Sequence, residues 1–253
     1  MVNTFSFCLY GPENPRYYPG ILENVYLAGT YFPTWKVYIY YAPDVTHTIV
    51  EHLSACSNVV MKPTGILGEK NMIHRFFAID EPEVDLMMVR DADSRIHWKD
   101  RWAIRRFVAS PCLGHTIRDN IEHTACMMGG LWGLKRSAGI NVRAEYEKYT
   151  EDVSLGHRNA HDQNFLADVI YPKVLPSLLV HYSNGRVFVG ETRAVAFPFE
   201  WSNDIYCGRV EFGFIDNPEP PPTRILTRMS EPFPLMIEPS TVSQLPLQFL
   251  RKK

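Results

Sequence analysis

The sequence lacks a long apolar run, an excess of charge of either sign and an N-terminal targeting pattern. None of its 253 residues falls in a stretch of about 18 consecutive apolar residues, so no transmembrane segment is expected. The net charge is only −2, which gives no general attraction to nucleic acid or to an anionic membrane, and no nucleic-acid partner is expected. The N-terminus has no basic region and no long apolar segment, so we expect a first strand there and not a signal peptide.

Cysteine is scarce, and its spacing argues against a disulfide framework. The five cysteines are far apart, are odd in number and form no C-x-x-C pair. The sequence also contains no N-x-S/T glycosylation sequon. These features predict reduced, mostly buried thiols and a cytoplasmic location.

Several well-known active-site motifs are missing as well. There is no G-x-G-x-x-G and no G-x-S-x-G, and the segment 62–70 does not have the spacing of a phosphate-binding P-loop. His157 and His161 are four residues apart, but H-E-x-x-H is absent, so a structural role is expected for them. Dinucleotide-binding, P-loop, serine-hydrolase and zinc-protease chemistry are therefore not indicated.

What is present is an alternation of short apolar runs with helical patterns, in a chain that is 45% hydrophobic. The alternation predicts an α/β fold with right-handed crossovers and a mainly parallel sheet. The expected strands are Phe5–Tyr10, Trp35–Tyr41, Asn58–Met61 and Leu86–Val89, with helices over 21–32, 47–55 and 69–79 between them.

The second half of the chain continues with helices at 98–109, 140–150 and the later part of 157–168, and with a strand at 178–181. Residues 125–135 suggest a strand whose glycines let another group approach closely, or alternatively a bulge. The basic stripe Arg101, Arg105 and Arg106 is either a solvated helix face or a contact for an anionic acceptor or lipid phosphate. We expect one domain over 1–215 and a Pro-rich tail or linker over 216–253.

Two acids follow the apolar run of the fourth strand, one residue apart. Asp91 and Asp93 lie where open α/β sheets bind ligands, at the carboxyl end of a strand. Two carboxylates at this spacing can share Mn²⁺ or Mg²⁺, which would stabilise charge on a diphosphate leaving group. The alternative is a loop cap or a surface ion pair. His181 ends a later buried strand and is a candidate third metal ligand, or otherwise a satisfied core histidine.

Four blocks of sequence occur in a fixed order around these acids. They are Val89-Arg-Asp-Ala-Asp-Ser-Arg95, His115-Thr-Ile-Arg-Asp-Asn-Ile-Glu-His123, Met128-Gly-Gly-Leu-Trp-Gly133 and Asp162-Gln-Asn-Phe-Leu166. The blocks resemble those of GT-A-type glycosyltransferases, including a group found in bacterial surface-glycan loci and large DNA viruses. The resemblance covers roughly residues 4–190 and implies a single Rossmann-like GT-A domain, with a mainly parallel mixed sheet flanked by helices.

The resemblance also implies roles for individual residues. Asp91 and Asp93 would bind the metal and the nucleotide-sugar, Asp162 would lie near the transferred sugar, and Arg75 would reach ribose or phosphate. The implied set for the nucleotide-sugar is Leu9, Tyr10, Gly11, Arg16, Arg75, Arg90, Asp91, Ala92, Asp93, Gly129, Gly130 and Gln163. The sequence departs from the pattern after His181, where Tyr182-Ser183 stands in place of an expected acidic residue.

The function that the resemblance implies is a metal-dependent glycosyltransferase. It would move a sugar from a nucleotide diphosphate sugar, such as a UDP- or GDP-sugar, to a glycan, glycoconjugate or other hydroxyl acceptor. An inverting enzyme needs a base, for which Asp162 is the first candidate and Asp119 the second; a retaining enzyme does not use that base in the same way. The alternatives are a metal-dependent phosphatase or nucleotidyltransferase, and a non-catalytic glycan- or partner-binding module.

Overall fold

The computed structural model describes residues 1–149, 161–183, 187–199, 201 and 205–211. The expected domain boundary at 215, the Pro-rich tail and His157 lie outside these described residues. Among the described residues, none of the helices combines the length and the apolarity that a membrane crossing requires.

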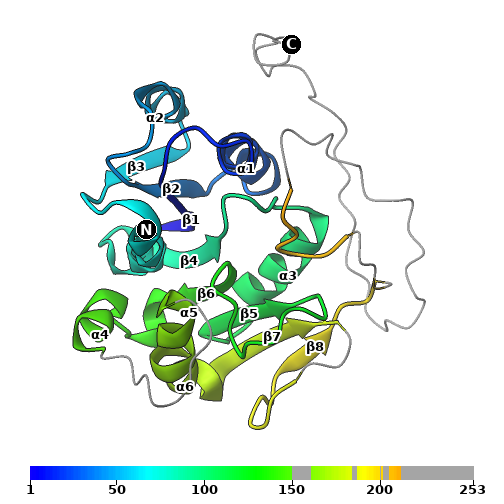
Figure 1. Ribbon diagram of the computed structural model, residues 1–253. Helices are drawn as coiled ribbons and strands as arrows, with labels where there is room; N and C mark the ends of the chain where they lie inside the picture. Colours follow the sequence, from blue (N-terminus) through cyan, green and yellow to red (C-terminus); the bar gives the residue numbers. More distant parts are fainter. Residues whose placement is uncertain (150–160, 184–186, 200, 202–204, 212–253) are drawn as a thin grey trace.

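The core of the fold is an eight-stranded sheet in the order β3-β2-β1-β4-β6-β5-β7-β8 (Figure 1). β6 runs antiparallel to both of its neighbours, β4 and β5, and all other neighbouring pairs are parallel. The mainly parallel mixed sheet expected from the sequence is therefore confirmed. The strands are β1 Val2–Leu9, β2 Lys36–Tyr41, β3 Val59–Pro63, β4 Val84–Arg90, β5 Gly114–Arg118, β6 Leu131–Lys135, β7 Leu178–Tyr182 and β8 Ala194–Ala196.

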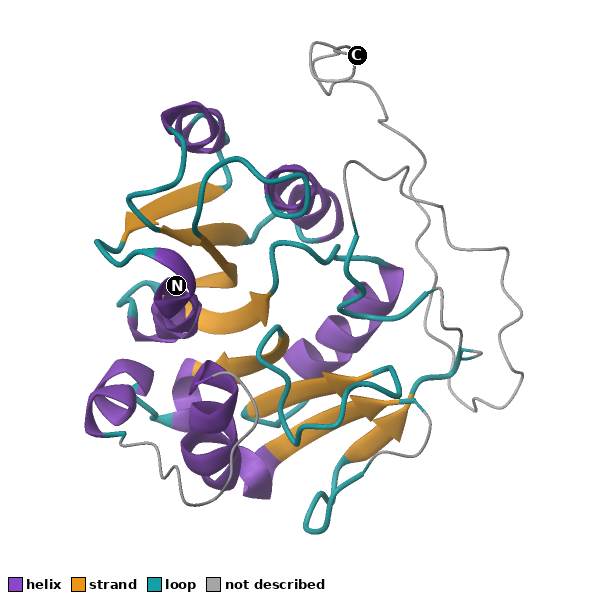
Figure 2. Ribbon diagram, in the orientation of Figure 1, coloured by secondary structure: helices purple, strands orange, loops and turns teal. Residues whose placement is uncertain are grey.

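Helices cover both faces of the sheet (Figure 2). One face packs against α1 (Tyr18–Tyr31), α2 (His47–Ser54) and α3 (Trp98–Ala109). The other packs against η1 (Gly68–Asp80), α4 (Val142–Lys148), α5 (His161–Phe165), η4 (Leu166–Ile170) and α6 (Tyr171–Val174). Two short 3₁₀ turns, η2 (Arg136–Ala138) and η5 (Leu175–Ser177), complete the described helical elements.

Strand β4 is buried on both faces, as its continuous apolar run predicts. Leu86 and Met88 join the core beneath α1 to α3, and Met87 and Val89 join the core on the opposite face. Alternation of side chains along a strand produces this division. The strand therefore runs through the middle of the protein and delivers the following loop, residues 91–95, to the carboxyl edge of the sheet.

Two expected elements differ from the structure. The segment expected to be an α-helix over 69–79 is a 3₁₀ helix, and the side-chain amide of its Asn71 donates to the carbonyl oxygens of Leu9 and Tyr40 at 3.2 Å. These bonds hold the helix against the ends of β1 and β2. The strand expected over 125–135 is confirmed only from Leu131 onward, because the preceding residues form turns that carry Gly129 and Gly130.

Candidate active site

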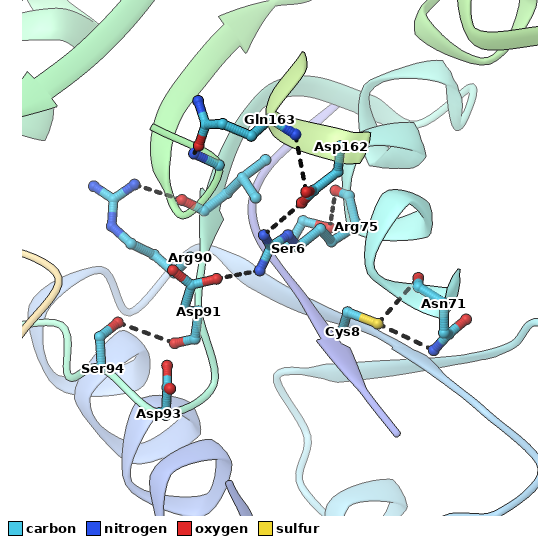
Figure 3. A network of polar contacts seen from close by, with 12 residues as sticks. Ser6, Cys8, Asn71, Arg75, Arg90, Asp91, Asp93, Ser94, Asp162 and Gln163 are labelled. Atoms are coloured by element: carbon cyan, nitrogen blue, oxygen red, sulfur yellow. Dashed lines mark hydrogen bonds and ion pairs between the residues drawn. The ribbon is translucent and has the colours of Figure 1, made fainter. Parts of the chain in front are cut away.

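The two acids of the loop after β4 each contact an arginine, and Figure 3 shows the contact between Asp91 and Arg75. Asp91 is 40% exposed and accepts a hydrogen bond from Arg75. Asp93 is only 7% exposed, and its Oδ2 accepts from Nε and Nη2 of Arg16, both at 2.5 Å. Burial and the negative charge of Asp91 raise the pKa of Asp93, and Arg16 opposes that shift. Asp91 is therefore the accessible acid of the pair, and Asp93 is the enclosed one.

Arg75 connects elements that are far apart in the sequence. Arg75 lies on η1, and its Nη1 contacts Asp91. Its Nη2 lies 3.0 Å from Oδ2 of Asp162, the second residue of α5. Burial works against the charge of this guanidinium, but Asp91 and Asp162 outweigh burial and raise the pKa of Arg75 above its usual value. Arg75 thus remains a cation held between two carboxylates.

Gly129 and Gly130 allow the backbone to approach this group. A Cβ atom added at Gly130 would lie 1.9 Å from Oδ2 of Asp91, and one at Gly129 would lie 3.2 Å from Nη2 of Arg75. The backbone N–H of Gly129 also donates to Oε1 of Gln163 at 2.9 Å. The close approach expected at these glycines is confirmed, and the approaching group is the Asp91–Arg75 pair.

Together these groups line a pocket of about 310 Å³. Six of the predicted site residues contribute to its wall: Arg75, Asp91, Gly129, Gly130, Asp162 and Gln163. The wall also contains His123 and Gly208, which the sequence did not single out as site residues. His123 accepts a hydrogen bond from the backbone N–H of Asp119 at 3.0 Å through its Nδ1.

Gly208 belongs to residues 205–211, which we call the C-terminal strap. The backbone N–H of Glu211 donates to the carbonyl oxygen of Asp93 at 2.8 Å. The carbonyl of Ile205 accepts from the ammonium group of Lys99 at 2.9 Å. These bonds hold the strap against the site, where its Gly208 forms part of the pocket wall. Residues 205–211 contain no recognisable motif, so only their position after β8 could have indicated that they reach the pocket.

The other residues predicted around the nucleotide lie outside the pocket wall. Leu9 is a core residue at the end of β1, and the N–H of Gly11 donates to Asp44 at 3.0 Å. Tyr10 lies 6.1 Å from Tyr17, measured between ring centroids. The base-binding role of this strand end remains a prediction.

Arg90 and Ala92 are enclosed within the fold. Nε of Arg90 donates to Asp100 at 2.9 Å, and both side chains are almost fully buried. Ala92 is buried beside Gly20 of α1, where an added Cβ would lie 2.0 Å from the Ala92 carbonyl oxygen. The structure thus places Arg90 in a buried ion pair instead of beside the pocket.

Asp119, the second candidate base, is also enclosed. Its two carboxylate oxygens accept from Lys99 at 3.1 Å, from the hydroxyl of Ser183 at 2.5 Å and from the backbone N–H of Cys207 at 3.0 Å. Its side chain is fully buried, so it does not meet an acceptor hydroxyl in this structure. The geometry gives Asp119 the role of an anchor for the C-terminal strap.

His181 does not join the two acids. Its Nδ1 lies 2.8 Å from Nε2 of His115, and both rings are completely buried. Among the described residues, no group of three metal-ligating side chains contains Asp91 or Asp93. The fold keeps His181 in the core because its ring packs against Trp102 and Phe197.

One group of three possible ligands occurs elsewhere in the described part of the chain, formed by His97, Asp100 and Cys207. Nδ1 of His97 accepts from the backbone N–H of Lys99 at 3.1 Å, which caps helix α3. A neutral imidazole that accepts at Nδ1 carries its proton on Nε2, so Nε2 has no lone pair for a cation. The positive end of the helix also disfavours a cation here. These residues form a helix cap.

The His115–His181 pair makes stability depend on pH. Burial and then the charge of Arg106 lower the pKa of His181 to about 3, while burial, His181 and Arg90 lower the pKa of His115. In the unfolded chain a histidine titrates near 6.5. The unfolded chain therefore binds more protons at acidic pH. The stabilisation is complete above about pH 6.5 and is lost as the pH falls toward 3.

We expect the free energy of unfolding, measured in urea, to fall by about 2 kcal/mol per pH unit between pH 6 and pH 5, because each of the two histidines contributes about 1 kcal/mol. The His181→Gln variant should show a shallower dependence. The matched control is His47→Gln, since the side chain of His47 is exposed at the start of α2. Identical slopes in wild type and the His181 variant would contradict this assignment.

No protein-family model and no curated protein matches the sequence. Among solved structures, the chain is similar to a glycosyltransferase involved in glycosylation of the major capsid of PBCV-1, with 14% identity, a TM-score of 0.46, and 72% of this chain and 82% of that chain covered.

It is likewise similar to residues 1–349 of S. aureus TarS, with 10% identity and a TM-score of 0.48, where 71% of this chain and 58% of TarS 1–349 are covered. A proposed glucose-1-phosphate thymidylyltransferase from Bacillus anthracis shows 11% identity and a TM-score of 0.47, with 74% and 91% covered.

Proposed function

We propose that the chain is a glycosyltransferase that binds a nucleotide diphosphate sugar in the pocket beside Asp91 and transfers the sugar to a hydroxyl group of a glycan or glycoconjugate. One observation carries the proposal. Three sequence blocks, represented by Asp91, by Gly129-Gly130 and by Asp162-Gln163, line a single pocket around the buried cation Arg75. Convergent charged groups in one cleft are the general mark of a binding or catalytic site.

The residues fit a divalent cation at Asp91 and Asp93. Carboxylate oxygens are the ligands that Mg²⁺ and Mn²⁺ prefer. Asp91 is half-exposed at the pocket, and its charge already disfavours the charged form of neighbouring Asp93, a repulsion that a cation relieves. These two acids would hold the cation. When bound, it would neutralise charge on the diphosphate.

The protein's own groups would share the remaining tasks. Arg75 is a fixed positive charge in a mostly buried position, and such preorganised charges stabilise the negative charge that develops on a leaving group. In an inverting reaction the acceptor hydroxyl oxygen bonds to the sugar carbon as the bond to the diphosphate oxygen breaks. Asp162, whose Oδ2 faces Arg75 at the pocket wall, would take the hydroxyl proton.

The Asp162→Asn variant should therefore lose about a hundredfold or more in kcat, because an amide accepts no proton, while the KM for the donor changes little. Asp168→Asn is the matched control, since Asp168 is an exposed acid on the continuation of the same helix and bonds the Tyr149 hydroxyl at 2.8 Å. Steady-state kinetics with saturating acceptor measure both constants. An unchanged kcat in Asp162→Asn would remove this residue from the role of base.

The proposed function is tested by the identity of the released product. The chain is incubated with UDP-, GDP- and dTDP-sugars and Mn²⁺, with a panel of glycan acceptors. Release of a nucleoside diphosphate together with a glycosylated acceptor is expected. Release of inorganic phosphate or pyrophosphate in its place would indicate the phosphatase or nucleotidyltransferase alternative and would overturn the proposal.

A further inference from the structure

Helix α3 carries three arginines within six residues on its outer side. We define the α3 arginine face as Arg101, Arg105 and Arg106 together with Trp98 and Trp102. None of Arg101, Arg105 and Arg106 forms an ion pair with a described carboxylate. The arginines that do form ion pairs in the described part of the chain are Arg16, Arg75, Arg90, Arg95, Arg118 and Arg209. The pocket proposed above uses none of them.

The arrangement is unfavourable without a ligand. Arg101 and Arg105 are four residues apart on a helix, where like charges repel. Burial, followed by the charge of Arg101, lowers the pKa of Arg105. Nε of Arg101 is a buried nitrogen with no hydrogen-bond partner.

Aromatic rings alternate with these guanidinium groups. Cζ of Arg106 lies 4.9 Å from the ring centroid of Trp102, and Cζ of Arg101 lies 5.6 Å from that of Tyr31. Trp98 and Trp102 are partly exposed, and both pack edge-on against Phe199, at 4.5 and 5.6 Å between centroids. The rings are therefore held in place by neighbours, and the face offers stacking surface and positive charge together.

The α3 arginine face adjoins the pocket. Trp102 and Phe199 pack on a small apolar cluster that contains Leu131, with Met128 also packed against it. Leu131 and Met128 are part of the pocket wall. This cluster thus connects the α3 arginine face with the pocket wall, and α3 begins shortly after the loop that follows β4 (Figure 1).

We propose that the α3 arginine face binds an anionic glycan, a chain of sugar rings that carry phosphate or carboxylate groups, as the extended part of the acceptor. The role of this glycan as acceptor rests on the function proposed above, whereas its binding to α3 does not. Sugar rings match the indole and phenyl rings, and the attached anions match guanidinium groups spread over about 7.5 Å of helix axis, at 1.5 Å per residue.

Other polyanions match the face less well. Insertion at a lipid surface needs exposed apolar side chains that reach past the headgroups. Among the described residues of α3, Val108 is the one large apolar residue that is exposed. Nucleic acid carries one charge about every 1.7 Å of duplex axis, and a chain with net charge −2 gives it no general attraction. A glycan with more widely spaced charges suits three guanidinium groups.

The test is a binding titration of the full chain with phosphorylated dextran, and with neutral dextran of the same length, in the absence of any sugar nucleotide. Wild type should bind the phosphorylated polymer with an affinity that falls as salt rises. The triple variant Arg101→Gln, Arg105→Gln, Arg106→Gln should bind about 10- to 100-fold more weakly, since each exposed ion pair contributes up to about fivefold. The single variant Arg105→Glu changes one exposed residue and should also bind more weakly than wild type. It tests the proposal even if the triple variant does not fold.

The matched control is Arg143→Gln, Lys148→Gln, Lys173→Gln, which removes three charges from helices α4 and α6 on the opposite face of the sheet. Its affinity should equal that of wild type. Equal binding by wild type and both α3 variants would overturn the proposal. So would binding to vesicles of phosphatidylglycerol and phosphatidylcholine, or to single-stranded DNA, without binding to phosphorylated dextran.

The same variants separate this inference from the proposed function. Turnover of a small neutral acceptor should be unchanged in the triple variant, because the pocket is intact. If no sugar nucleotide is turned over by any form while the polymer still binds through α3, the proposed function fails and the binding surface stands. If turnover occurs but polymer binding is the same in wild type and the triple variant, the binding surface fails alone.

Discussion

The Asp91→Asn variant is expected to lose about a thousandfold or more in kcat while remaining folded. Asp91 is the half-exposed carboxylate of the pocket, and it is the acid best placed for a cation and a diphosphate. An asparagine keeps the size of the side chain and removes its charge. The amide would also leave Arg75 with one carboxylate partner instead of two.

Asp85→Asn is the control for this change. Asp85 lies on β4, the strand that leads to Asp91, but is exposed, and substitution there should leave turnover unchanged. Turnover is measured with the best donor found in the product assay, and thermal unfolding checks that both variants fold. Retention of wild-type kcat by Asp91→Asn would show that the pocket works without this carboxylate.

The Gly130→Ala variant is expected to lose about a hundredfold in turnover. Its new methyl group would lie 1.9 Å from Oδ2 of Asp91, so the carboxylate has to move away from its position beside Arg75. Misplacement of a reacting or binding group by about 1 Å can cost roughly this much. The backbone at Gly130 is not in the left-handed region, so the effect is one of contact and not of backbone strain.

Gly29→Ala provides the matched control. The added Cβ there would meet only the side-chain nitrogen of Asn58 at 3.5 Å, an ordinary contact, and alanine favours the helix α1. Kinetics of the two alanine variants are compared with their thermal stabilities. Full activity in Gly130→Ala would contradict the close fit between the glycine turn and Asp91.

Local patterns were sufficient to predict most of the fold. The apolar runs of β1, β2, β3 and β4 and the amphipathic segments between them depend on neighbours in sequence, and the order of elements follows from them. The reversed direction of β6 does not follow, because it depends on pairing with β4 and β5. The sequence predicts a strand over 125–130, where the structure has turns. The turn at Gly130 fits closely against Asp91, and this contact between residues far apart in the sequence cannot be read from the local pattern.

The site was predictable to a similar extent. The sequence blocks and their resemblance singled out Asp91, Gly130 and Asp162, which the fold brings together. The resemblance also implied a site role for Arg75, and the structure places its guanidinium between Asp91 and Asp162.

Two of the predicted residues that lie elsewhere, Asp119 and His181, have partners that are remote in sequence. Asp119 is enclosed by Lys99 and Ser183, and His181 contacts His115, 66 residues away in sequence. No local pattern distinguishes a carboxylate or imidazole with such a buried partner from one that faces a pocket. The same reason explains why the C-terminal strap was missed, since Gly208 reaches the pocket only through the folded chain.

The most direct measurement is a crystal structure of the chain with a nucleoside diphosphate and Mn²⁺. The account predicts density for the metal and the diphosphate in the pocket beside Asp91, with Asp91 among the metal ligands and Arg75 near the phosphates. Nucleotide and metal bound at another place on the molecule, or an Asp91 carboxylate without contact to either, would contradict the account.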